Sequence, residues 1–289
     1  MAGPTTISNT VVRTFERNVR FLAQQQVNRL RPFVSEKSEE GGSHVWELLS
    51  KAEATEKTTR AQATPSTAYE FSNRVSLAKT WNAGYLVEQE DPTKTLIDLN
   101  GSITQAMGFS MRRAYDAAII TALGGASLDA DGNSIAYTAG QLIGDGTLPI
   151  TFDYVTQVQE KFMENDITPD VPKCFVVGPT QIRQLMQTTE ATSDDYVRGA
   201  LNQLSATGIV PNWMGFNWIC STLLQAPAGG QLDCYAFTKQ GVGLQVNKDI
   251  SVNIAQDPSR SFAWSLYCWA VFGATRVEDA QVVKLRVAN

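Results

Sequence analysis

Side chains that commonly perform catalysis are sparse in this chain. Its 289 residues include one histidine, His44, so a Ser-His-Asp or Cys-His site would have to use that residue. His44 follows Gly41-Gly42-Ser43 in a segment that we expect to form an extended hairpin, which would hold a catalytic group loosely. We therefore expect His44 to lie on the surface. A zinc site built from several histidines is excluded, because the chain has only one.

Paired carboxylates offer a second route to acid–base chemistry. Acidic residues gather in four polar, loop-like stretches: Glu39-Glu40, Glu88 with Glu90 and Asp91, Asp194-Asp195, and Glu278-Asp279. Two such groups could converge in the folded chain, since a general acid and a general base need only be close in space. A soluble α/β enzyme with a carboxylate-based site therefore stays open as an alternative, although solvated surface is the interpretation that we favour.

Other motifs that bind metals, phosphates or acyl groups are absent or incomplete. The sequence has no GxSxG, no GxxxxGK followed by Ser or Thr, and no GxGxxG after a strand. Asp129, Asp131 and Asn133 resemble a calcium loop, but Gly132 precedes the third ligand position instead of following it, so we expect a plain turn. The cysteines lie apart in apolar surroundings and are expected to be buried free thiols: Cys174, Cys220, Cys234 and Cys268. The sequence thus predicts no catalytic, cofactor-binding or metal-binding residue.

The composition is that of a folded, acidic protein. Hydrophobic residues make up 43% of the chain, enough to bury a core. The formal net charge of -5 argues against a dedicated nucleic-acid-binding module, which would usually be strongly basic. No 18-residue apolar run and no signal-peptide pattern is present, so we expect no transmembrane helix and no secretion.

One long helix is the element on which the others depend. Apolar residues recur at helical spacing: Leu96, Leu99, Ile103, Met107, Ala114, Ala118 and Ala122. We expect a helix over Pro92–Leu123 that ends at Gly124-Gly125. Asn100-Gly101 is a weak point, because glycine costs about 1 kcal/mol in a helix interior. The alternative is a shorter helix that begins near Ser102, where Gln105 could complete a capping box.

Residues 1–40 are expected to form an arm. One helical face, ended by Pro32, is marked by Val12, Phe15, Val19, Leu22 and Leu30. Between Met1 and Ser35 the arm holds five arginines and one acid: Arg13, Arg17, Arg20, Arg29, Arg31 and Glu16. Such a basic face either packs on its own domain or docks on an acidic neighbour or on packaged nucleic acid. The sequence leaves both interpretations open.

Residues 41–91 are expected to form an extended hairpin. His44–Leu48 can start one strand, and Lys51–Pro65 is a polar tip. From Tyr69 to Leu77, apolar and polar residues alternate with a period of two, which predicts a strand with one polar face. An isolated hairpin is marginally stable in water, so we expect this one to lean on another surface, such as another subunit.

The rest of the chain predicts a compact lobe and then long strands. The lobe covers residues 126–237, of which 126–150 are a connection rich in Gly, Asp and Thr. Residues 151–237 alternate helix and strand: a helix capped by Thr151 and ended by Asn165-Asp166, a strand at Cys174–Val177, a helix after Gly178-Pro179, a short helix through Val197–Leu204, and strands at 207–211, 215–220 and 232–237. Residues 238–289 predict three strands, over Val246–Ile254, Phe262–Phe272 and Val282–Val287. We expect the long helix to cover one face of these strands.

This order of elements resembles the major capsid proteins of tailed bacteriophages, which share the Hong Kong phage capsid fold. Three local stretches are also similar to that family: residues 112–125 to the end of its spine helix, Phe175–Pro179 to a strand–helix step, and Asn212–Ser221 to a strand before a loop. The resemblance implies an α+β fold with an N-terminal arm, an E-loop, a spine helix, an A domain and a P domain. These would cover residues 1–40, 41–91, 92–125, 126–237 and 238–289, the last being return strands of the P domain.

The same resemblance implies a structural role and no enzymatic activity. The chain would assemble with copies of itself, as hexamers and pentamers, into an icosahedral virion head made in the host cytoplasm around double-stranded DNA. Expected partners are a portal, scaffolding or decoration proteins and packaged DNA bound without specificity, with no membrane and no cofactor. An encapsulin-like shell around protein cargo has the same fold and is the second alternative.

Overall fold

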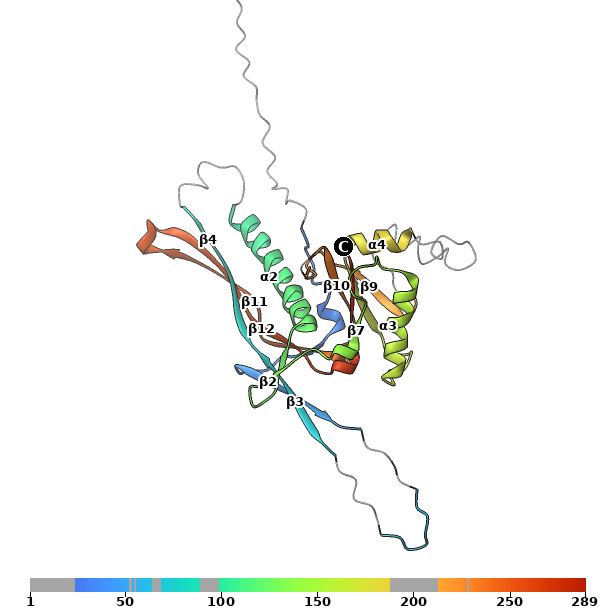
Figure 1. The fold of residues 1–289 in the computed structure, drawn as a ribbon. Coiled ribbons are helices and arrows are strands. Elements are labelled where there is room, and N and C mark those ends of the chain that lie inside the picture. Colours follow the sequence, from blue (N-terminus) through green and yellow to red (C-terminus); the bar gives the residue numbers. More distant parts are fainter. Residues whose placement is uncertain are drawn as a thin grey trace, which may run out of the picture.

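A computed structural model describes residues 24–51, 54, 56–63, 69–88, 99–187, 213–227 and 229–289. One long helix, α2 (Leu99–Gly124), lies between an elongated sheet and a compact lobe, and a long hairpin projects away from both (Figure 1). Helices and three sheets combine in one mixed α+β fold, which confirms the predicted fold class. None of the described helices is long and apolar enough to cross a membrane.

Helix α2 runs unbroken through Asn100-Gly101, so the shorter alternative starting at Ser102 is wrong. The expected start at Pro92 lies outside the described residues. The buried face is rotated slightly from the predicted alanine stripe, because the larger side chains fill the core: Met107, Met111, Tyr115, Ile119 and Leu123. Ala114, Ala118 and Ala122 are only half-buried.

The elongated sheet lies on one side of α2 and has the order β1-β11-β12-β4. Its strands are β1 (Ser35–Lys37), β11 (Val242–Asp257), β12 (Ala263–Arg276) and β4 (Lys79–Val87). The alternation predicted for β12 is confirmed, since Leu266, Cys268, Ala270 and Phe272 are all buried. Phe262 lies outside the strand and is exposed. Strand β4, within the segment expected to belong to the hairpin, instead pairs with β12.

The lobe is a five-stranded sheet in the order β7-β13-β10-β8-β9. It contains β7 (Leu142–Ile143), β13 (Val282–Ala288), β10 (Gln231–Thr238), β8 (Lys173–Val177), β9 (Phe216–Cys220), and the helices α3 (Phe152–Glu164) and α4 (Pro179–Met186). Thr151 caps α3 through its side chain, as expected. The helix expected at 197–204 and the strand at 207–211 lie outside the described residues.

Strand β13 corrects one expectation. We expected it to stack on α2 with the other late strands, but it pairs with β10 in the lobe. The physical reason is burial, because Val282, Val283, Leu285 and Val287 are all fully buried in the core. Asp233 on β10 also lies opposite Arg286 and accepts two hydrogen bonds from it, of 2.7 and 3.0 Å. Lys284 approaches the same carboxylate to 3.2 Å.

The hairpin belongs to a third sheet, in the order β2-β3-β5-β6. Strands β2 (Ser43–Leu49) and β3 (Phe71–Leu77) pair antiparallel as predicted, and β5 (Ser127–Leu128) and β6 (Ser134–Ile135) extend the sheet. We expected this segment to be a connection within the lobe, without strands. The turn between them is a plain one, because the Asp129 carboxylate accepts the backbone N–H of Asn133 at 2.7 Å.

The arm differs from its predicted helix where it is described. Residues 24–30 are not helical, and Pro32 lies in a single 3-10 turn, Arg31–Phe33. The rest of the expected helical face lies outside the described residues, apart from Leu30, whose side chain is fully buried. A proline at the second position fits a 3-10 turn, since it removes a backbone N–H that the first turn leaves unpaired anyway.

Two glycines of α2 make a matched test of its packing. An added methyl at Gly108 would meet nothing within 4 Å, whereas at Gly124 it would overlap the hydroxyl of the buried Tyr235. Gly108→Ala should raise the free energy of unfolding by about 0.5–1 kcal/mol, because alanine loses less backbone entropy. Gly124→Ala should lower it by about 1–3 kcal/mol. Urea unfolding measures both, and shifts of the same sign would contradict the packing described.

Candidate functional site

Side chains that bind metals do not cluster in the part of the chain that the structure describes. No three His, Cys, Asp or Glu side chains gather there to hold a metal. His44 is not the surface residue that we expected, because its side chain is only 16% exposed. Its Nδ1 lies 2.7 Å from Glu39 Oε2, and its ring packs edge-on against Trp46. The single histidine therefore stabilises the start of the hairpin through these two contacts.

The cysteines also serve packing. All four are free thiols, and three are buried as expected: Cys174, Cys234 and Cys268. Cys220 is only half-buried, because it lies at the end of β9, the outermost strand of the lobe sheet. Burial raises the pKa of the Cys234 thiol to about 12, so that thiol is protonated and unreactive at neutral pH.

Three described members of the acidic clusters singled out in the sequence make contacts with neighbouring side chains. Glu39 binds His44, Glu278 accepts a hydrogen bond from Gln281, and Asp279 pairs with Arg276. Glu40 and Glu88 are exposed. The other members of these clusters, Glu90, Asp91, Asp194 and Asp195, lie outside the described residues.

Three carboxylates that the sequence analysis missed join segments that are distant in the sequence: Asp116, Asp233 and Asp249. A signal for two of them was present, because Asp116 and Asp233 are single acids inside apolar stretches of a helix and a strand. A lone carboxylate in such a stretch is rarely buried without a partner. Their partners are distant in sequence, so the spacing could not identify them.

Asp116 fixes the N-terminal segment on α2. It is 1% exposed, and its two oxygens accept the backbone N–H groups of Leu30 at 3.2 Å and Arg29 at 2.9 Å. Gln25 Nε2 donates to the same carboxylate. Burial raises the pKa of Asp116 above its ordinary value, although these hydrogen bonds oppose the rise. Arg112, one turn earlier on α2, donates to the carbonyl of Gln26 at 2.7 Å.

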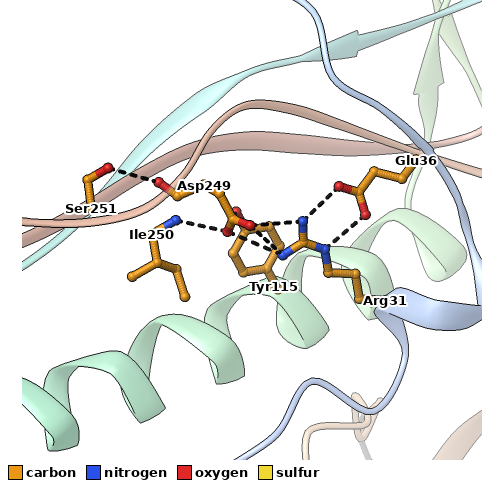
Figure 2. Close-up of polar contacts among 6 residues, drawn as sticks. All are labelled: Arg31, Glu36, Tyr115, Asp249, Ile250 and Ser251. Carbon is orange, nitrogen blue, oxygen red and sulfur yellow. Dashed lines mark hydrogen bonds and ion pairs between the residues drawn. The ribbon is translucent and has the colours of Figure 1, made fainter.

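A charged cluster continues this attachment to the elongated sheet (Figure 2). The Arg31 guanidinium donates to Glu36 at 2.7 and 2.9 Å and to Asp249 at 3.1 to 3.2 Å. It also lies 5.0 Å from the ring centre of Tyr115, whose hydroxyl donates to Asp249 at 3.2 Å. One arginine thus joins the arm, β1, α2 and β11.

Asp249 lies in an irregular part of β11, where the register shifts between Val246 and Ser251. Its carboxylate also accepts the backbone N–H of Ile250 at 2.8 Å. Burial opposes ionisation of this carboxylate, but the hydrogen bonds from Arg31, Ile250 and Tyr115 outweigh it and lower the pKa. The cluster therefore holds the strand at its bend.

The two described arginines of the arm bind groups of their own chain. Arg31 binds Glu36 and Asp249, and Arg29 Nη1 donates to the carbonyl of Cys220 at 2.5 Å. For these two, packing on the chain's own domain is the interpretation that the structure supports. Arg13, Arg17 and Arg20 lie outside the described residues.

One face of the hairpin leaves several large apolar side chains exposed to solvent. Leu49 lies opposite Phe71, Val45 opposite Val75, and Leu77 opposite Ser43, so these side chains share one face. The polar pair Glu47 and Asn73 interrupts this face at its middle. We call this the hairpin face; its exposed members are Val45, Leu49, Phe71 and Leu77, with Tyr69 beside them. Phe71 is 78% exposed.

The opposite face of the hairpin is the one that the chain buries. Trp46 Nε1 donates to Ser76 Oγ at 3.2 Å, and Ser76 Oγ donates to Gln245 Oε1 of β11 at 3.0 Å. Gly243 has no side chain, which leaves room for the Trp46 ring. At the end of β3 that contacts β11, the face that carries the polar residues is therefore the buried face.

A groove continues the hairpin face toward α2. It has a volume of about 480 Å³, and its walls include Val75, Leu77, Trp81, Ala118, Ala122 and Phe272. The half-buried alanines of α2 form one wall because their side chains are too short to fill the space. Together the hairpin face and the groove make an apolar surface suited to contact with another protein.

Comparisons with known proteins give one family. The family model described as phage capsid protein matches residues 7–289. Three solved structures superpose over nearly the whole chain. The capsid of cyanophage Pam1 is 13% identical with a TM-score of 0.75 and covers 100% of this chain and 99% of its own. The capsid of cyanophage P-SCSP1u is 16% identical with a TM-score of 0.73, covering 99% and 96%. The capsid of the native GTA particle is 11% identical with a TM-score of 0.71, covering 100% of both. No curated protein sequence matches.

Removing the Asp116 carboxylate should loosen the arm. Asp116→Ala leaves the buried N–H groups of Arg29 and Leu30 without an acceptor, which should cost about 2–4 kcal/mol of unfolding free energy. It should also open the Arg29–Leu30 bond to trypsin, which mass spectrometry of the fragments detects. Asp131→Ala, in an exposed turn, is the control. Equal cleavage of both variants would contradict the role of Asp116.

The Arg31 cluster predicts a pH-dependent contribution to stability. The folded pKa of Asp249 lies below its ordinary value of 3.8, so its contribution is complete above that value and is lost as pH falls through the folded pKa. Asp249→Asn should lower the melting temperature by about 2–4 °C near neutral pH. The difference from the wild type should close below pH 3.8. A difference that stays constant down to pH 2 would show that the Asp249 charge contributes nothing.

Proposed function

The chain belongs to the phage capsid protein family, and from that premise we propose that its copies assemble as hexamers and pentamers into an icosahedral head around double-stranded DNA. Membership makes the chain a structural major capsid protein and a component of the virion. The observation that supports assembly best is the uncovered apolar surface formed by the hairpin face and the groove beside α2. A second copy would cover it.

The division of labour within the subunit is part of this proposal. Helix α2 would act as the spine, the hairpin would reach over a neighbour as an E-loop, and the arm would clasp another copy. The lobe would gather around the five- and six-fold axes as an A domain. The return strands β11 and β12, with β4, would form the P domain. Many weak contacts, repeated by symmetry, would stabilise the shell.

We also infer that the chain acts without catalysis. Of the described carboxylates that could have formed an acid–base pair, Glu39, Glu278 and Asp279 are tied to His44, Gln281 and Arg276. Glu40 and Glu88 are exposed to solvent. An encapsulin-like shell would share the fold, but the family match is to phage capsid proteins over residues 7–289. A portal, scaffolding or decoration proteins and DNA bound without specificity complete the proposed partners, and synthesis would take place in the host cytoplasm.

The hairpin face gives the test of this function. Phe71→Thr keeps a residue that favours strands but removes the most exposed aromatic ring among the described residues. The free energy of unfolding of unassembled subunits should change by less than about 0.5 kcal/mol. The yield of closed shells, counted by negative-stain electron microscopy, should fall at least tenfold.

The neighbouring substitution Ser72→Thr is the matched control, because Ser72 is exposed on the other face of the same strand. It should leave the shell yield unchanged. Purified wild-type protein that stays monomeric under assembly conditions would overturn the proposed function itself. Shells that hold protein cargo in place of DNA would favour the encapsulin-like alternative.

A further inference from the structure

The turn between β11 and β12 holds a bulky aromatic residue in an unfavourable backbone conformation. Ser261 and Phe262 both adopt the left-handed region, with φ of 51° and 55°. Residues other than glycine, asparagine and aspartate are uncommon there, and a bulky side chain is an outlier. The Phe262 side chain is also 54% exposed. A strained backbone that displays an apolar ring to solvent gives the isolated subunit no advantage.

The turn is nevertheless well fixed. The Asp257 carboxylate accepts the backbone N–H of Ser259 at 3.0 Å and its hydroxyl at 2.6 Å, and Arg260 approaches the same group to 3.7 Å. The turn lies at the end of the elongated sheet farthest from the lobe (Figure 1). Phe262 is thus presented by a preorganised loop, which lowers the entropy lost on binding.

The same end of the sheet carries a hollow of about 450 Å³. Its lining comes from β4, β12 and the turn, and includes Gly84, Leu86, Arg260 and Tyr267. Phe262 does not line it. Leu86, the exposed Tyr267 ring and the Arg260 guanidinium offer the apolar, edge-on and cation–π contacts that an aromatic ring prefers.

We propose that Phe262 of one copy inserts into this hollow of a second copy. The proposal rests on the proposed function, since it needs copies of the chain to meet. A knob and a hollow that do not fill each other within one chain make a head-to-tail contact, in which each copy both gives and receives. Such contacts close into a ring when the rotation between copies allows it. The unfavourable backbone conformation at Phe262 would then serve to orient the ring toward the second copy.

Two substitutions at Phe262 separate assembly from folding. Phe262→Asn removes the ring and relieves the strain, because asparagine tolerates the left-handed region. Unassembled F262N subunits should melt at or above the wild-type temperature, while the yield of closed shells falls at least tenfold. Phe262→Tyr keeps the ring and should retain shell formation.

A crosslinking experiment tests the predicted partner directly. Phe262→Cys and Gly84→Cys subunits are purified separately, mixed, assembled and oxidised. Positions 262 and 84 of one chain are too far apart for a disulfide, since Tyr267 is the register partner of Gly84 and lies five residues beyond Phe262, about 17 Å along the strand. A cysteine side chain fits at position 84, because an added Cβ would meet nothing closer than 3.7 Å. A covalent dimer should form in the mixture and in neither variant alone.

Each outcome decides the proposal. The mixed dimer, together with loss of shells in F262N, supports it. Shells from both the wild type and F262N, or dimers from Phe262→Cys alone, overturn the inference but leave the proposed function standing. Wild-type protein that forms no shells overturns the proposed function, and the inference with it.

Discussion

The structure depends on one helix, α2, because two sheets pack against opposite sides of it. On one side of α2, Tyr115 stacks on Phe272 of β12 with ring centres 3.7 Å apart and planes 15° from parallel. On the other side, Gly124 leaves room for Tyr235 of β10. Neither sheet could keep its place without the helix, because each would expose one apolar face. Burying both faces on one rigid rod joins the lobe and the elongated sheet into one body.

Arg276 secures the same junction electrostatically. It ends β12 in the elongated sheet, and the chain then crosses to β13 in the lobe. Its fully buried guanidinium donates to the carbonyl of Gly125, pairs with Asp279 and lies 4.9 Å from the ring centre of Tyr137. A cation at the carboxyl end of α2 opposes the negative pole of the helix dipole. The contacts of Asp116 and Arg31 attach the arm near the middle of the same helix, so the arm and the crossover are both fixed to α2.

Local patterns predicted the elements of this fold well, and long-range pairing poorly. Thr151 as a cap, Pro179 as a helix start and the alternation of β12 each follow from contacts within a few residues. The partner of β13 was not predictable in this way, because Asp233 and Arg286 are more than fifty residues apart. The same limit explains why Asp116 and Asp249 were missed. Their role depends on an arm that crosses the helix, and no spacing in the sequence encodes that crossing.

In the hairpin, the sequence pattern of a single chain does not predict which face of a strand is buried, and the reason is physical. Alternation in β3 correctly marks two unlike faces, but the usual inference that the apolar face is the buried one is wrong here. Ser76 is buried and Phe71 is exposed, because the root of the hairpin is held by the hydrogen bonds of Trp46, Ser76 and Gln245. A monomer gains little from this arrangement, since exposed apolar area stabilises nothing and invites aggregation. A subunit that reaches its lowest free energy only in a shell has its apolar residues placed to contact other subunits. The exposed apolar residues of one chain therefore mark the surfaces that its neighbours would cover.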